Sequence, residues 1–289
     1  MSQADATATQ RSRSPHGGCA ILSRYAVVLD TVGQASGGLP LTEIGQRTGL
    51  PQATVYRPVH ALVHVGFLAQ GERRKHYVLG PRLLRLLCAG MPRRTIRQLA
   101  QPILDRLAAD FGETAFIAKL EGDEVETVAV APPKGERQAF VHPGRSMPFH
   151  AAASAKAILA FADDQLVVDV LAKPHTQFTA RTKISEQEIT AELAKIRQQG
   201  FAICDQELDP GVLSYACPIR IDGAGVVYSL GLVGLADRLG DSRSVQVVSS
   251  LKAAAETLSN VIREDAGSSS AWAAALPAGN GVGQLAAGL

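Results

Sequence analysis

The chain has 289 residues, of which 46% are apolar and 19% charged, so it is long enough for about two domains that each bury a core. Its net charge of +2 conceals a division, because residues 1–94 carry 12 Lys and Arg against 4 Asp and Glu, whereas residues 95–289 carry 17 against 23. No apolar run reaches the roughly 20 residues of a membrane helix, and the first residues lack the apolar core of a signal peptide. Four cysteines without a Cys-x-x-Cys pair disfavour a disulfide framework or a zinc site and favour a reducing cytoplasm.

Two helices are predicted between residues 19 and 50. The apolar residues of the first recur at three- and four-residue steps and so share one face: Leu22, Tyr25, Leu29 and Val32. The pair Gly37-Gly38 ends that segment. Thr42 then serves as the N-cap of a short second helix, and Gly49 follows its last turn as the C-terminal glycine.

A third helix is predicted over residues 52–66, with Pro51 at its first position. Its apolar face carries Val55, Val59 and Leu62. The rest of its surface fits the major groove of DNA, and the DNA contacts predicted there are Gln52, Ala53, Thr54, Tyr56, Arg57 and His60. Pro58 conflicts with this helix, because a proline inside a helix removes a backbone donor and costs roughly 3 kcal/mol. We therefore expect a kink or an early end after Arg57.

Two short β-like runs follow at residues 67–70 and 76–79, and a basic turn joins them into a hairpin. The tip of the hairpin carries the residues predicted to meet phosphates or the minor groove: Arg73, Arg74 and Lys75. This order of three helices and a basic hairpin is that of a winged helix-turn-helix. It predicts binding to double-stranded DNA, in which a dimer sets two recognition helices about 34 Å apart on a palindromic operator.

A leucine-rich segment, GPRLLRLLCAG, leads into the second block. We expect a short linker helix whose apolar side packs on a partner chain or on the next domain. Further helices are predicted at residues 96–111, 151–160, 185–199 and 245–263, and the third of them begins with a capping box of Ser185 and Glu188. Two hairpins are predicted, one pairing residues 114–120 with 125–130 and one pairing 213–221 with 226–233. Hairpins flanked by helices predict an α+β domain with an antiparallel sheet.

Four segments carry a family likeness: LTEIGQRTGLPQATVYR and HYVLGPRLLRL in the first block, and MPFHAAASAKAILA and GFAICDQELDPGVLSYACPI in the second. In this order they resemble the IclR family of bacterial transcription regulators over about residues 20–264. The resemblance implies a GAF-like effector-binding domain after the winged helix-turn-helix, a homodimer or homotetramer, and a small organic acid as the effector.

An effector pocket is also implied by the resemblance, formed by Ala153, Ser154, Cys204, Val212, Ser214, Gly231 and Val233. Family members that bind very small keto acids tend to have Asp in place of Cys204 and Ser in place of Gly231 and Val233. This difference implies a larger, less polar pocket here, suited to an aromatic or longer aliphatic carboxylate. The N-terminus of the Ala-rich helix suits a carboxylate because its backbone N–H groups are free.

The predicted organisation has five parts: a disordered tail at residues 1–18, the winged helix-turn-helix domain at 19–80, the linker helix at 81–94, the GAF-like domain at 95–265 and a flexible tail at 266–289. Two other functions stay open. One is a ligand-binding module in which Pro58 has abolished DNA binding. The other is an enzyme, which is disfavoured because no convergent nucleophile, base and orienter can be found.

We therefore predict no enzymatic activity, no cofactor and no metal. Ser154 and Lys156 lie two residues apart and point to different faces of a helix. His60 and His64 have a spacing that can bind metal but lack a third ligand nearby.

Overall fold

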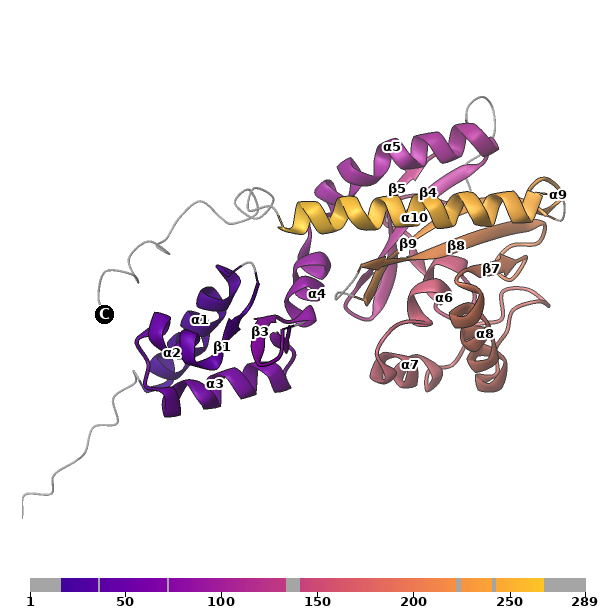
Figure 1. The fold of residues 1–289 in the computed structure, drawn as a ribbon. Helices are drawn as coiled ribbons and strands as arrows, with labels where there is room; N and C mark the ends of the chain where they lie inside the picture. The colour runs from indigo at the N-terminus through magenta and orange to yellow at the C-terminus, as the bar shows by residue number, and fades with distance from the viewer. Residues whose placement is uncertain are drawn as a thin grey trace, which may run out of the picture. The chain divides into compact units, whose positions relative to one another are not determined.

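The computed structural model describes residues 17–35, 37–71, 73–133, 141–221, 225–240 and 243–267 (Figure 1). The chain forms two compact units, Met1–Leu83 and Leu84–Leu289, and each is described by itself. Most of both predicted tails lies outside the described residues. None of the helices in the described ranges combines the length and hydropathy of a membrane-spanning segment.

Three helices and a small antiparallel sheet make up the first unit. The helices are α1 (Gly17–Gly33), α2 (Leu41–Thr48) and α3 (Gln52–His64). The strands are β1 (Leu39–Pro40), β2 (Leu68–Gln70) and β3 (His76–Leu79), in the order β1-β3-β2. The core that joins them consists of Val28, Val32, Leu39, Ile44, Val55, Val59, Leu62, Leu68 and Tyr77. The predicted winged helix-turn-helix is therefore confirmed, with β1 as a third wing strand that the sequence analysis missed.

The helix α3 continues unbroken through Pro58 to His64, so the expected early end after Arg57 is wrong. The Pro58 ring is buried, as are Val55 and Val59 beside it. Packing of this apolar face keeps the helix intact although one backbone hydrogen bond is missing, because most helical stability in proteins comes from tertiary packing.

Helix boundaries in the first unit differ from the prediction by one to a few residues. The N-cap position of α2 is Pro40 rather than Thr42, and Pro51 is the N-cap of α3 rather than its first residue. Gly49 does end α2, with a left-handed φ of 67°. Leu22 was predicted to lie on the buried face of α1, but its side chain is 72% exposed. Val28, which was not predicted on that face, is buried in the core.

The second unit is built on a six-stranded antiparallel sheet with the order β6-β5-β4-β9-β8-β7. Its strands are β4 (Thr114–Glu121), β5 (Glu124–Ala131), β6 (Ser146–Met147), β7 (Ala202–Asp205), β8 (Val212–Ile221) and β9 (Gly225–Leu235). Its helices are α5 (Arg93–Phe111), α6 (Ala153–Leu159), α7 (Asp164–Leu171), α8 (Glu186–Gln199), α9 (Ala236–Leu239) and α10 (Ser244–Gly267). Helix α4 (Pro81–Gly90) crosses the boundary between the units.

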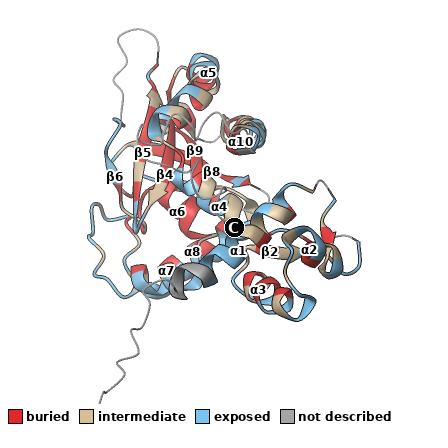
Figure 2. Ribbon diagram, turned by 90° about the vertical axis from the view of Figure 1, so that its left-hand side faces the viewer, coloured by how far each residue is buried: buried red, intermediate tan, exposed pale blue. Residues whose placement is uncertain are grey.

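Helices cover both faces of this sheet. Figure 2 shows α5 and α10 on one side and α6 and α8 on the other, with buried strands between them. The α5–α10 face holds the largest hydrophobic cluster, which includes Ile96, Leu104, Leu230 and Leu258. The other face divides into two clusters around α6. The unit is therefore α+β, as predicted.

Local signals in the sequence located most of these elements. The Ser185 and Glu188 capping box is present at the start of α8, and both predicted hairpins form. Leu84 and Leu87 of α4 pack against the large cluster, which is the expected packing on the next domain. The Ala-rich helix is shorter than predicted, at Ala153–Leu159, while α7 and the edge strand β7 were not predicted as elements.

Candidate functional site

Helix α3 presents a polar face opposite its buried residues. Gln52, Ala53, Tyr56, Arg57 and His60 are exposed on it, and Thr54 is half-buried. Because Val55, Val59 and Leu62 fix the opposite side in the core, the helix offers its exposed side chains in a defined orientation. This geometry suits a helix that enters the major groove.

An aromatic contact that the sequence analysis missed links α3 to the wing. The rings of Tyr56 and His60 have centroids 4.0 Å apart, one helical turn along α3. His60 also makes an edge contact with Tyr77 of β3, at 6.3 Å. The i, i+4 spacing of Tyr56 and His60 was a signal for the first contact, whereas the second depends on the fold of the wing.

The wing tip carries its three cationic side chains in the open. Arg73, Arg74 and Lys75 are all exposed, and Lys75 has a left-handed φ of 66°. The turn is closed by the His76 N–H, which donates to the Arg73 carbonyl at 3.0 Å, and by the Gly71 N–H, which donates to the His76 carbonyl at 2.9 Å. The wing can therefore present three positive charges to phosphates from one short turn.

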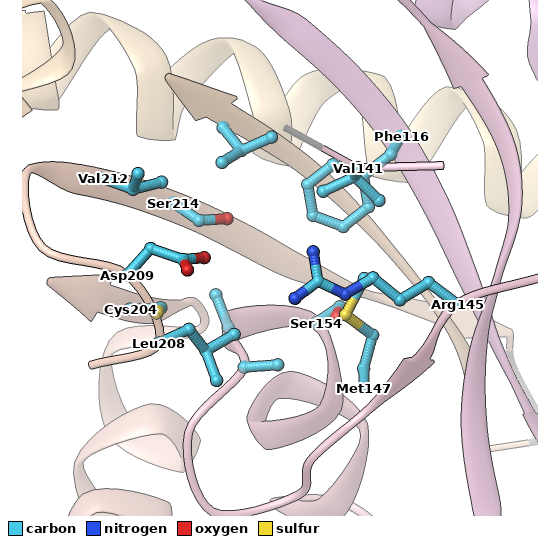
Figure 3. A pocket seen from close by; sticks show the side chains of 13 residues that line it. Phe116, Val141, Arg145, Met147, Ser154, Cys204, Leu208, Asp209, Val212 and Ser214 are labelled. Atoms are coloured by element: carbon cyan, nitrogen blue, oxygen red, sulfur yellow. The ribbon is translucent and has the colours of Figure 1, made fainter. Parts of the chain in front are cut away.

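A cavity of about 40 Å³ lies in the second unit, between the sheet and the segment that leads into α6 (Figure 3). Six of the seven residues expected to form the effector pocket line it: Ala153, Ser154, Cys204, Val212, Ser214 and Val233. They come from α6 and from the neighbouring strands β7, β8 and β9, where Ser214 pairs with Cys204 on one side and with Val233 on the other. Residues that are distant in the sequence are thus brought together around one space.

Gly231, the seventh expected residue, does not line the cavity. It pairs with Phe116 across β9 and β4, and a Cβ atom at Gly231 would lie 2.5 Å from Cζ of that ring. The space that a serine would take is therefore filled by an aromatic side chain that the sequence analysis did not consider. The enlargement expected from Gly231 is absent for this reason.

Seven further residues complete the cavity wall and were missed: Phe116, Val141, Arg145, Met147, Ala152, Leu208 and Asp209. Ala152 directly precedes the predicted pocket residue Ala153, and Leu208 lies in the segment GFAICDQELDPGVLSYACPI, so the sequence did offer a signal for these two residues. Arg145 and Met147 reach the cavity from the segment around β6, and no periodicity in the sequence indicates that approach.

The start of α6 is held in place by the sheet, since the Ser229 hydroxyl donates to the Ser154 carbonyl at 3.0 Å. Helix α6 spans only seven residues and has no side-chain cap, so its N-terminus by itself is weak support for a carboxylate site. Burial is the largest influence on the Cys204 thiol, and it raises the pKa of that group. The thiol therefore stays protonated and apolar in the cavity wall.

A buried ion cluster fixes the loop at residues 206–211, which carries Leu208 and Asp209. The Lys156 ammonium lies 2.6 Å from Oε1 of Glu207, and Lys183 lies 3.3 Å from the same atom. The Thr182 hydroxyl donates to the Glu207 carbonyl at 2.6 Å. Lys156 thus acts as a structural cation, and its partner is Glu207 rather than Ser154.

No arrangement of metal ligands is evident in the described ranges, which hold no group of three or more His, Cys, Asp or Glu side chains placed around a common point. Burial also raises the pKa of the Cys88 thiol to about 11 and that of Cys217 to about 12. Thiols with such pKa values are poor nucleophiles and poor metal ligands at neutral pH.

Comparison with known proteins gives a family match for each of the two units. Residues 22–72 match the IclR helix-turn-helix domain, and residues 88–260 match the family described as bacterial transcriptional regulator IclR C-terminal. The chain is 32% identical to the HTH-type transcriptional regulator BhcR of Paracoccus denitrificans over 254 residues, covering 87% of this chain and 91% of that protein.

Solved structures agree with this placement. A putative IclR transcriptional regulator from Silicibacter sp. TM1040 superposes with a TM-score of 0.58 at 28% identity, covering 84% of this chain and 95% of that one. An IclR homolog from Microbacterium hydrocarbonoxydans, complexed with 4-hydroxybenzoate, has a TM-score of 0.55 at 26% identity, covering 84% and 99% of the two chains. The chain belongs to the IclR family of bacterial transcriptional regulators, with a DNA-binding first unit and an effector-binding second unit.

Proposed function

We propose that this regulator responds to an aromatic or longer aliphatic carboxylic acid that binds in the cavity of the second unit. The observation that carries the proposal is the convergence of six expected pocket residues on one largely apolar cavity. The complex of the Microbacterium hydrocarbonoxydans homolog with 4-hydroxybenzoate supports an aromatic acid as the first candidate.

Binding of such an acid requires the cavity wall to move. A dry cavity of about 150 Å³ holds one benzene molecule, whereas the space here is about 40 Å³. Side chains such as Phe116, Leu208 and Arg145 must therefore shift when the acid enters. A ligand changes a conformational equilibrium through its differential affinity for the two states, and this movement supplies that difference.

On the DNA side, we propose that a homodimer or homotetramer binds a palindromic operator. In that complex the wing faces phosphates through Arg73, Arg74 and Lys75. Helix α3 faces the base edges through its predicted contact residues: Gln52, Ala53, Thr54, Tyr56, Arg57 and His60. The intact α3 favours this function over a module whose Pro58 has abolished DNA binding. Because its target is chromosomal DNA, we propose that the protein works in the cytoplasm.

We also propose that the chain has no enzymatic activity. Lys156, the one lysine beside the expected pocket residues of α6, is already paired with Glu207, so it is not poised as a general base. The described cavity wall offers Ser154 and Ser214 as hydroxyls without a histidine in contact with the cavity.

Gel-shift and thermal-shift measurements test the proposal together. A DNA fragment from upstream of the protein's own gene should form a salt-sensitive complex that competitor DNA of unrelated sequence does not displace. Benzoate, 4-hydroxybenzoate, phenylacetate and hexanoate should then be screened for a rise in melting temperature, since a ligand that binds the native state stabilises it. Ser214→Trp should abolish the rise and leave DNA binding intact. Absence of the specific complex, or of any stabilising acid, contradicts the proposal.

A further inference from the structure

The chain that connects the two units bends at residues 88–93, where α4 passes into α5, and we call these residues the elbow. The side chains of Cys88 and Met91 are buried there in the largest hydrophobic cluster of the second unit. Because α4 crosses the boundary between the units, the elbow is the point where the second unit holds the segment that leads to the DNA-binding unit.

Two buried side chains of the sheet donate to backbone carbonyls of the elbow. The Tyr228 hydroxyl donates to the Cys88 carbonyl at 2.5 Å, and the Lys119 ammonium donates to the Met91 carbonyl at 3.0 Å. Tyr228 is fully buried and Lys119 is 4% exposed. A hydroxyl or an ammonium group in the interior is costly without an acceptor. These bonds therefore favour the setting of the elbow that supplies both acceptors.

The start of α5 is tied to the same part of the sheet by ion pairs. Arg93 pairs with Glu121 of β4 at 2.5 Å and with Glu126 of β5 at 2.7 Å. Glu121 also lies 3.2 Å from the Lys119 ammonium. The elbow is thus held to the sheet on the α4 side by hydrogen bonds and on the α5 side by charge.

The strands that hold the elbow also border the cavity. Lys119 of β4 and Tyr228 of β9 lie directly opposite each other in the antiparallel pairing, and Phe116 on β4 lines the cavity. Ser229, the residue after Tyr228, faces the α6 side of the sheet (Figure 2) and donates to the carbonyl of Ser154, another lining residue. Consecutive residues of β9 therefore hold the elbow on one face and the cavity wall on the other.

We infer that Lys119 and Tyr228 are positioning residues, which fix the C-terminal end of α4 to two strands of the cavity and so make its setting depend on the cavity wall. The inference rests on the proposed function for the acid that moves this wall. Packed interiors have low compressibility and transmit strain, so a shift of either strand reaches the groups bonded to it. An acid that favours one setting of the strands then favours one setting of α4.

Cysteine labelling of the full chain measures the hold on the elbow without any ligand. Cys88 lies in the elbow, whereas Cys204 and Cys217 are buried elsewhere in the second unit. Opening of the whole unit exposes all three thiols, while local opening of the elbow exposes Cys88 alone. N-ethylmaleimide labelling followed by mass spectrometry gives a separate rate for each cysteine.

The test variants are Tyr228→Phe and Lys119→Met, which remove the two donors and keep side chains of similar size. Two matched controls remove the same kinds of donor elsewhere in the second unit. Ser259→Ala removes a hydroxyl that donates from α10 to a carbonyl of β8, and Lys252→Met removes an ammonium that donates from α10 to a carbonyl at the end of α8. Melting temperatures establish that each variant is folded.

Labelling of Cys88 should rise about three- to tenfold relative to Cys204 and Cys217 in both test variants, because one buried hydrogen bond no longer opposes opening of the elbow. Both controls should keep the wild-type ratio. A role in general stability alone would raise all three rates by the same factor.

The acid response is the second readout. Each variant is titrated with whichever of benzoate, 4-hydroxybenzoate, phenylacetate and hexanoate raises the wild-type melting temperature most. That rise should persist in both test variants, since neither residue is among the described lining residues of the cavity. The acid's effect on affinity for the upstream DNA fragment should fall from about fivefold or more to less than about twofold.

An equal rise at all three cysteines would overturn the inference, as would wild-type labelling of Cys88 in both test variants. Retention of the full acid effect on DNA affinity in both variants would overturn it as well. If none of these acids stabilises the wild type, the proposed function fails for them, and the cysteine ratios still decide separately whether Lys119 and Tyr228 hold the elbow.

Discussion

The Lys156 ammonium and the Glu207 carboxylate lie 2.6 Å apart with almost no exposure of either side chain, and they join α6 to the loop before β8. Both elements line the cavity of the second unit, α6 through Ala153 and Ser154 and the loop through Leu208 and Asp209. This buried pair therefore determines how closely two walls of the cavity approach each other.

Glu207→Gln should destabilise the second unit by about 3 kcal/mol, because removing one partner of a buried ion pair leaves the other charge uncompensated. The remaining contact of Lys156 with Glu192, at 3.7 Å, keeps the loss at the lower end of the usual range. Urea denaturation measures the change. Glu43→Gln, at an exposed i, i+4 pair with Arg47, should change stability by less than about 0.5 kcal/mol. Equal effects of the two substitutions would argue against the structural role of the pair.

Gly231→Ala should destabilise the second unit by about 1–3 kcal/mol through overpacking. The new Cβ would lie 2.5 Å from the Phe116 ring and 2.8 Å from the Tyr215 carbonyl oxygen. Adding Phe116→Leu should recover part of the loss, since the ring clash is relieved while the carbonyl contact stays. Thermal denaturation of the single and double variants checks this, and a fully additive double variant would contradict the assigned clash.

Arg57→Ala should cost about 1–3 kcal/mol of specific DNA affinity if its exposed side chain reads a base. Arg74→Ala on the wing should instead weaken binding to all sequences and reduce the slope of log K against log salt concentration by about 1. Fluorescence anisotropy with operator and unrelated DNA at several salt concentrations separates the two effects. If Arg57→Ala leaves the sequence preference unchanged, Arg57 does not read a base and is only a solvent-exposed residue.

The stability of the second unit should fall as the pH is lowered through the range near 6.5. Burial, and secondly the nearby His150, lowers the pKa of His175, and the two rings have centroids 4.7 Å apart. His175 therefore takes up a proton at a higher pH in the unfolded chain than in the native one. Its contribution to stability is complete above its pKa in the unfolded chain, and it is lost as the pH falls toward its pKa in the native chain. His175→Gln should flatten the dependence of unfolding free energy on pH between 7.5 and 5.5. The same slope in both proteins would exclude His175 as its source.

Local chemistry explains why much of the fold could be predicted. Ser185 and Glu188 satisfy the free N–H groups of one helix end whatever surrounds them, and Gly49, Gly112 and Gly200 take the left-handed conformation that ends a helix. The effect of Pro58 was predicted wrongly because the lost backbone hydrogen bond can be seen in the sequence. The packing of its buried ring, which offsets that loss, depends on the folded unit. The spacing of Arg145 and Asp209 in the sequence could not predict that both line one cavity, because the segments that carry them are brought together by the whole sheet.

The pairing of Phe116 with Gly231 across β4 and β9 makes the volumes of these two positions interdependent. A lineage that gains a side chain at the glycine needs a smaller residue in place of the phenylalanine, and a smaller residue at that position alone enlarges the cavity that Phe116 lines. Related regulators should therefore show these two sites covarying, and libraries that randomise them jointly offer a direct route to biosensors with altered inducer size.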